Sequence, residues 1–294
     1  MGHMLLGRTR AAGAVLAAVA LLCPRPASAG DTVIVSGADL PAYKAVEQSF
    51  SAALGGPSTS VTLTDADAIK GAGLVFAIGP EAARALAASH TSALQLVALV
   101  PNSEKTGLDA RVPMVPMFVP AARQLKAFKA VLPSLKNLGV IYDPSLSKAL
   151  VADCEAAAVS ASITVVKSPV ADRAAVASAA RTLLPWVDAL WLIPDKTVIS
   201  AETFKFLVET SIGAKVPLLG FSEGMARAGA LVSVEAGYPE IGKHAAAAAR
   251  RALAGAAPAP EAPEGTLFLN AKSAALLGAQ LPKAARDGAA KVFE

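Results

Sequence analysis

Short apolar runs alternate with longer runs of helical periodicity along most of this sequence, and this alternation limits the fold more than any other feature. A strand buried on both faces of a parallel sheet is short and continuously apolar, whereas a covering helix repeats its apolar residues every three or four positions. In the first part of the chain we expect strands at 32–35, 61–63, 74–78 and 94–100, and helices at 41–54 and 80–89. Strands joined by helices in this way form parallel sheets with right-handed crossovers.

The same organisation resumes after a connector, residues 112–120, in which Pro113, Pro116 and Pro120 make the chain extended and stiff. Beyond it we expect strands at 137–142, 164–167, 189–193, 216–221 and 230–234, and helices at 121–132, 148–160, 173–184 and 200–211. A repeated β-helix-β pattern on both sides of a stiff connector predicts two similar lobes.

The C-terminal part of the chain is expected to return to each lobe in turn. Residues 238–253 predict a helix, residues 255–265 have the proline- and alanine-rich composition of a linker, and residues 266–270 can add a last strand. We therefore predict an α/β fold of two Rossmann-like lobes with parallel sheets, joined by a hinge of three chain crossings. The first lobe comprises 30–118 plus 235–256, and the second comprises 119–234 plus 265–283.

The N-terminal segment is typical of an export signal. Arg8 and Arg10 precede an apolar run at 11–22, and the small residues 27–29 fit a cleavage site, so we predict a signal peptide at 1–29 and a periplasmic mature protein. The run is too short for a comfortable transmembrane span. Lipid anchoring at Cys23 is the alternative, but the leucine before it is bulkier than such sites usually accept.

Removal of this leader makes the protein nearly neutral. The chain has 27 basic and 23 acidic residues, and the leader contains Arg8, Arg10 and Arg25 but no acidic residue. A nucleic-acid partner calls for a clustered basic surface, so we expect none. Cys154 is then the one cysteine left, and on an alanine-rich segment we expect it to be a small buried apolar residue.

Catalytic motifs are sparse. Residues 220–224 match G-x-S-x-G, and Ser222 could be a nucleophile if an acid and then a histidine followed it, an order that Glu235 or Glu240 with His244 supplies. An acid and a base so close in sequence are not the usual arrangement. The histidines and cysteines show no metal-ligand spacing and there is no glycine-rich phosphate loop, so we predict no metal site and no cofactor.

Five stretches carry a family resemblance: GVIYDPS at 139–145, ALWLIPD at 189–195, VPLLGFSEGMARAGALVSV at 216–234, GYPEIGKHAA at 237–246 and LFLNAKSAALLGAQLP at 267–282. In this order they resemble the ABC-transporter substrate-binding proteins of the type I periplasmic-binding group, in particular the branch related to binders of tryptophan and other aromatic amino acids. The resemblance implies a non-enzymatic, monomeric receptor that closes on a small organic ligand, such as an amino acid or aromatic compound. It would deliver this solute to an inner-membrane ABC permease. A periplasmic ligand-sensing module and a serine hydrolase using Ser222 are the alternatives.

In such a receptor the ligand contacts should come from strand ends that face the cleft. The residues expected there are Ser36, Tyr43, Gly79 and Pro80 from the first lobe, Tyr142, Asp143, Pro194, Asp195, Phe221 and Ser222 from the second, and Tyr238 near the crossing. Backbone amides at 79–81, where a helix begins, could hold a carboxylate. Tyr142, Phe221 and Tyr238 could stack on a flat ligand.

Several of these residues have a structural alternative. Asp143 and Asp195 could cap the turns that follow them, and the Gly79-Pro80 pair could be an ordinary strand-to-helix turn. Tyr43 has the helical spacing of a residue that faces the core. Trp186 and Trp191 are expected to be packing residues.

Overall fold

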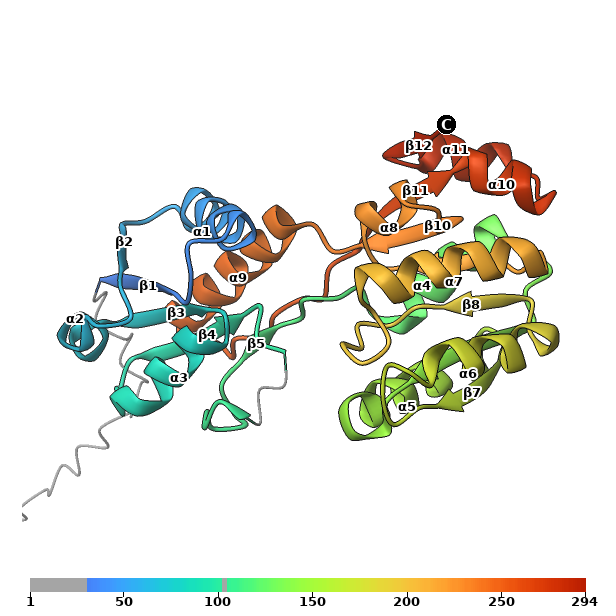
Figure 1. The fold of residues 1–294 in the computed structure, drawn as a ribbon. Coiled ribbons are helices and arrows are strands. Elements are labelled where there is room, and N and C mark those ends of the chain that lie inside the picture. The colour runs from blue at the N-terminus through green and yellow to red at the C-terminus, as the bar shows by residue number, and fades with distance from the viewer. Residues whose placement is uncertain (1–30, 102–104) are drawn as a thin grey trace, which may run out of the picture.

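The computed structural model describes residues 31–101 and 105–294 and builds them around two β-sheets, each covered by helices (Figure 1). The predicted signal peptide and Cys23 lie outside the described residues. The α/β class with two mostly parallel sheets is as the sequence predicts. In the described part of the chain, no helix combines the length and the apolar character needed to cross a membrane.

The first sheet has the strand order β2-β1-β3-β4-β5, and all of its pairs are parallel. Its strands are β1 (Thr32–Ser36), β2 (Ser58–Val61), β3 (Leu74–Ile78), β4 (Leu94–Ala98) and β5 (Met114–Val115), and the helices between them are α1 (Pro41–Leu54), α2 (Ala66–Gly71) and α3 (Pro80–Ser89). One face packs Ile34 and Phe76 against Phe50 of α1, whereas the other packs Val33 and Val75 with residues of α2 and α3. Both faces are thus buried, which explains why these strands are apolar throughout.

The second sheet has the order β12-β11-β10-β9-β8-β6-β7. Its strands are β6 (Asn137–Tyr142), β7 (Thr164–Pro169), β8 (Ala189–Trp191), β9 (Leu218–Gly220), β10 (Val232–Glu235), β11 (Thr266–Asn270) and β12 (Lys291–Phe293). Its helices are α4 (Ala121–Val131), α5 (Pro144–Ser160), α6 (Val176–Leu183), α7 (Ala201–Ala214), α8 (Glu223–Arg227), α10 (Ala271–Leu277) and α11 (Lys283–Gly288). The β10–β11 pair is antiparallel, because β11 enters the sheet from a different direction after the chain has visited the first lobe.

The chain passes between the two sheets at three places (Figure 1). It leaves β5 for α4, leaves β10 for α9 (Tyr238–Leu253), which packs against α1, and leaves α9 for β11. These passages touch one another at Gly265, where an added Cβ would lie 2.6 Å from Val119 and 2.8 Å from Val234. Since Gly265 also has φ +91°, only glycine fits this junction without strain.

Local signals set several element boundaries as predicted. Prolines occupy the first turn of α1, α3 and α9, where the missing N–H costs nothing. Helix α5 also begins with a proline, Pro144, four residues before the predicted start at residue 148. Ser200 and Thr203 form a reciprocal capping box at the start of α7.

Other expectations were wrong in detail. Residues 112–120 are not simply a connector, because Met114 and Val115 form β5 beside β4. The flanking prolines limit this strand, since proline cannot donate to a sheet. Trp191 is buried as expected, but Trp186 has 74% of its surface exposed. It ends the 3₁₀ turn Leu184–Trp186, which directs its ring outward although its sequence neighbours are apolar.

Candidate functional site

The carboxyl edge of the first sheet brings together the four residues predicted from this lobe. Ser36 is paired with Ile78, the residue before Gly79, and Pro80 begins α3. The ring of Tyr43 lies directly on Gly79, because an added Cβ there would come within 2.6 Å of two ring carbons. Tyr43 is therefore half-buried, covering Gly79 while it also packs against the core of the first lobe.

This edge of the first sheet has few free backbone N–H groups that could bind the carboxylate of a ligand. Gly79 uses its N–H to donate to Ala98 O at 2.9 Å, and Pro80 has none, so Glu81 alone of these three residues still offers a backbone donor. The carboxylate of Glu81 pairs with Arg84 at 3.0 Å. Burial and the negative charge of Glu81 raise the pKa of Tyr43, so its phenol stays neutral.

At the edge of the second sheet, Asp143 and Asp195 lock the ends of β6 and β8 together. Asp195 Oδ2 accepts from Asp143 N at 2.7 Å, and its Oδ1 accepts from Thr197 N at 2.9 Å and Val198 N at 3.3 Å. Asp143 Oδ1 accepts from the N–H and hydroxyl of Ser145 at 2.8 and 2.7 Å, and its Oδ2 accepts from the Thr197 hydroxyl at 2.8 Å. Every carboxylate oxygen is engaged, so both side chains position the cleft edge.

This network predicts a loss of stability in acid. Hydrogen bonds from Ser145 and Thr197 hold the pKa of Asp143 below its ordinary value. A carboxyl whose pKa is lower in the folded state stabilises the fold above the unfolded pKa of about 3.9, and this contribution disappears as the pH falls through the folded pKa. We expect urea unfolding at pH 7 and pH 3 to show a larger loss of stability for the wild type than for Asp143→Asn. Equal losses would show that Asp143 contributes nothing to the acid sensitivity.

Phe221 and Ser222 follow β9 at the same edge. Phe221 contacts Phe118 edge to face, with ring centroids 5.9 Å apart. Ser222 caps α8, its Oγ accepting from Met225 N at 3.3 Å. Phe118 is not among the predicted site residues, because its segment, residues 112–120, was expected only to be a stiff connector. The signal that could have found it is an aromatic residue between prolines in a segment that crosses the cleft.

The remaining aromatic candidates differ in exposure. Tyr142 is half-buried beside the core. Tyr238, at the start of α9, has 40% of its surface exposed. Burial and the nearby Glu235 raise the pKa of Tyr238, so its hydroxyl is a neutral donor.

A cavity of about 610 Å³, here named the outer cavity, lies between the two sheets. Val100, Pro101 and Met114 line it from the first lobe. The second lobe and the crossing supply Phe118, Leu146, Ser147, Ala149, Leu150, Asp153, Pro194 and Lys196. Its size is in the range of small-molecule sites.

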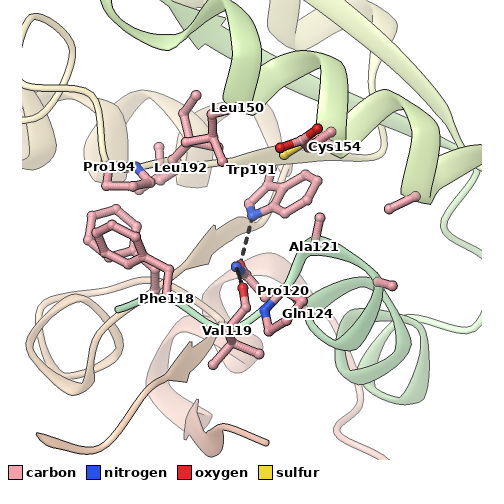
Figure 2. A pocket seen from close by; sticks show the side chains of 15 residues that line it. Phe118, Val119, Pro120, Ala121, Gln124, Leu150, Cys154, Trp191, Leu192 and Pro194 are labelled. Carbon is pink, nitrogen blue, oxygen red and sulfur yellow. Dashed lines mark hydrogen bonds between the residues drawn. The ribbon is translucent and has the colours of Figure 1, made fainter. Parts of the chain in front are cut away.

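A second cavity of about 370 Å³, here named the inner pocket, adjoins it inside the second lobe (Figure 2). Pro194 lines both cavities and Phe221 lines the inner pocket. Ser36, Tyr43, Gly79 and Tyr238 line neither. The structure thus gathers the predicted residues into two groups, one on each lobe.

Among the residues that the structure describes, Ser222, the two glutamates and His244 do not assemble into a serine triad. The imidazole of His244 lies 3.5 Å from Glu240 and 3.8 Å from Glu261, on the helix that packs against α1. Ser222 instead caps α8, and Glu235 accepts from Glu223 N at 2.8 Å. The G-x-S-x-G match is therefore the cap of a short helix.

Comparisons with known proteins agree with this geometry. A family model described as ABC transporter substrate binding protein matches residues 37–293. A search of curated proteins found no match. The family that matches consists of substrate-binding proteins, which are not enzymes, so the hydrolase alternative is wrong.

Three solved structures illustrate the similarity. A domain from Streptococcus pneumonia in complex with L-Trp is 23% identical, with a TM-score of 0.59, covering 90% of this chain and 100% of that chain. A conserved domain protein from Vibrio cholerae is 20% identical, with a TM-score of 0.60 and the same coverage. The ligand-free, open structure of a substrate binding protein with adhesive properties from Clostridium difficile is 20% identical, with a TM-score of 0.69, covering 90% and 99%. With the family model matching most of its length, this chain belongs to the ABC transporter substrate-binding protein family.

Proposed function

We propose that this protein is the periplasmic solute-binding component of an ABC importer. It closes its two lobes around a small organic ligand, an amino acid or aromatic compound, and delivers it to an inner-membrane permease. The observation that carries this proposal is the outer cavity, whose lining comes from both lobes. A ligand that touches both walls binds the closed state better than the open one, and so shifts the population towards closure.

The three crossings suit such a movement. Each lobe has its own sheet. The first lobe comprises 30–118 plus 235–256, and the second comprises 119–234 plus 265–283. Strand β12 extends the second lobe to Phe293. The crossings meet at Val119, Val234 and Gly265, and we expect the lobes to rotate about this junction. Arg123 of α4 also pairs with Glu264 at 2.9 Å, and Glu264 N donates to Glu240 of α9 at 2.7 Å. This links the third crossing to both lobes.

The chemistry of the cavity supports an aromatic or amino acid ligand. Phe118 and Phe221 form an aromatic pair where the crossing meets the second lobe. Asp153 and Lys196 line the outer cavity, and the positive charge of Lys196 also helps to lower the pKa of Asp143. One charge of each sign beside an aromatic pair matches a zwitterion with a flat side chain. The matched structure from Streptococcus pneumonia contains L-Trp.

A thermal-unfolding screen of the chain from residue 30 onward tests the proposal. Amino acids, aromatic metabolites, nucleosides and small cofactors form the library. A ligand at a hundred times its dissociation constant stabilises the folded state by about 2.7 kcal/mol, a shift of several degrees at most for a chain of this size. We expect saturable shifts from one class of compound, and no shift from any class would contradict the proposal.

Phe118→Ala should weaken the binding of that compound by about tenfold, because aromatic anchors at the centre of a site are often worth more than 1 kcal/mol. Phe206→Ala is the matched control, since Phe206 lies on α7 beneath Arg181 and lines neither cavity. Isothermal titration calorimetry measures both. Equal affinities for the two variants would remove Phe118 from the site. Uptake by cells that lack the gene then separates transport from a purely sensing role.

A further inference from the structure

The inner pocket adjoins the outer cavity. Phe118, Leu150, Asp153 and Pro194 line both of them. The inner pocket lies next to the space between the lobes, and residues of α4 and α5 line it (Figure 2). The outer cavity provides the closure that the proposed function requires, whereas the inner pocket belongs to one lobe only.

Small side chains create this space. Ala121 of α4 and Ala157 of α5 are partly buried and line the pocket, together with the buried Cys154. Burial raises the pKa of the Cys154 thiol to about 12, so the thiol is a neutral, apolar part of the wall. A larger residue at either alanine would occupy the volume that a ligand group could fill.

The floor of the pocket is aromatic and rigid. Trp191 Nε1 donates to Gln124 Oε1 at 3.1 Å, and Gln124 Nε2 donates to Val119 O at 2.7 Å (Figure 2). Trp191 also packs edge to face on Phe128, with ring centroids 5.7 Å apart. Because the polar groups of the floor already have partners, the pocket favours an apolar, flat group over a polar one.

A carboxylate, that of Asp153, lies at the entrance of the inner pocket. Asp153 is the ionisable carboxylate among the lining residues of the inner pocket, whereas Lys196 lines the outer cavity alone. Asp153 is exposed and makes no hydrogen bond or ion pair with the residues that the structure describes. A cationic group attached close to the flat group would lie next to this carboxylate.

On the basis of the proposed function, we propose that the inner pocket is the specificity site of this receptor. It takes a neutral aromatic group of the ligand, and Asp153 at its mouth takes the ammonium group that the same ligand carries. Ala121 and Ala157 set the size of the group that enters. The ligand class is thus an aromatic amine or aromatic amino acid rather than an aromatic acid.

Three probes that share one phenyl ring test this: phenethylamine, L-phenylalanine and 3-phenylpropanoate. The chain has two tryptophans, and Trp186→Phe leaves Trp191 in the pocket floor as the one indole reporter. We expect phenethylamine and L-phenylalanine to change Trp191 fluorescence saturably. The acid should bind about threefold to fivefold more weakly, the size expected for one exposed charge. Asp153→Asn, an exposed substitution that leaves the core intact, should remove this preference.

Ala157→Leu should weaken the binding of phenethylamine at least about tenfold, because leucine adds three carbon atoms and even one extra methylene in an apolar pocket has this effect. Ala156→Leu on the same helix is the matched control, since Ala156 is exposed and lines neither cavity. Ala121→Leu repeats the test from α4, and circular dichroism shows which variants are folded.

The outcomes separate this inference from the proposed function. Suppose that a compound without a phenyl-like group shifts the unfolding temperature, while none of the three probes changes the Trp191 fluorescence. The proposed solute-binding function then holds, and the assignment of the inner pocket as the specificity site is wrong. The same holds if folded Ala157→Leu and Ala121→Leu bind the probes like Ala156→Leu. If the acid binds as well as the amine, the role of Asp153 is overturned.

Discussion

Replacing Gly242 by alanine is expected to lower the free energy of unfolding by about 1–2 kcal/mol, although alanine is the better helix former. Gly242 lies in α9 where this helix crosses α1. An added Cβ would overlap Ser49 Oγ and Val46 O and would lie 2.9 Å from Phe50 N. Two of these atoms belong to the α1 backbone, so relief requires the helices to separate. Overpacking typically costs about 1–3 kcal/mol, which exceeds the gain of about 1 kcal/mol in helix propensity.

Gly213→Ala is the matched control. Gly213 lies in α7, and an added Cβ would meet nothing within 4 Å. The substitution should therefore stabilise the protein by about 0.4–1 kcal/mol, because it restricts the unfolded chain without a clash. Urea unfolding of the two variants should give changes of opposite sign. Stabilisation by Gly242→Ala would show that α1 and α9 do not pack as closely as described.

The second large effect is expected from Asp195→Ala, which should destabilise the protein by about 3 kcal/mol. Asp195 has 2% of its surface exposed and accepts three backbone N–H groups, from Asp143, Thr197 and Val198. Alanine would leave these donors without an acceptor, and each buried unsatisfied group costs about 1–3 kcal/mol, less when water can enter.

Asp188→Ala provides the comparison at the opposite edge of the same sheet. Asp188 Oδ2 accepts from Lys136 N at 2.9 Å and from Asn137 N at 2.7 Å, but this group is exposed, so water can replace it. We expect a loss below about 1 kcal/mol there. If Asp195 acted mainly as a ligand contact, Asp195→Ala would lower ligand affinity while leaving urea unfolding unchanged, and the structural role argued above would be wrong.

Much of the fold could be predicted from residues close together in sequence. Proline in the first turn, apolar periodicity and left-handed residues after the last turn fixed α1, whose bounds are as predicted. The bounds of α3, β3 and β6 were also as predicted, because each apolar run ends at a glycine, an aspartate or a proline. Strand β5 was not predicted, since two residues between prolines give no periodicity and are held only by their partner β4.

The site was less accessible to sequence reasoning. Strand ends pointed correctly to Pro194 and Phe221, which line the cavities, because the carboxyl ends of parallel strands meet at one edge. The same reasoning named Asp143 and Asp195 without revealing that they bind each other's loops. Phe118 has a weak sequence signal, its position between two prolines of a crossing segment, whereas the alanines of the inner pocket have none.

The sequence by itself therefore determined most of the longer strands and helices, their order, and the edge at which a ligand site would form. These properties depend on propensity, capping and periodicity, which act within a few residues. Only the tertiary structure decided that Tyr43 covers Gly79, that Phe118 meets Phe221, and that α4 and α5 leave a pocket above Trp191. Such contacts join residues far apart in the chain, and they depend on the packing of whole elements rather than on any local preference.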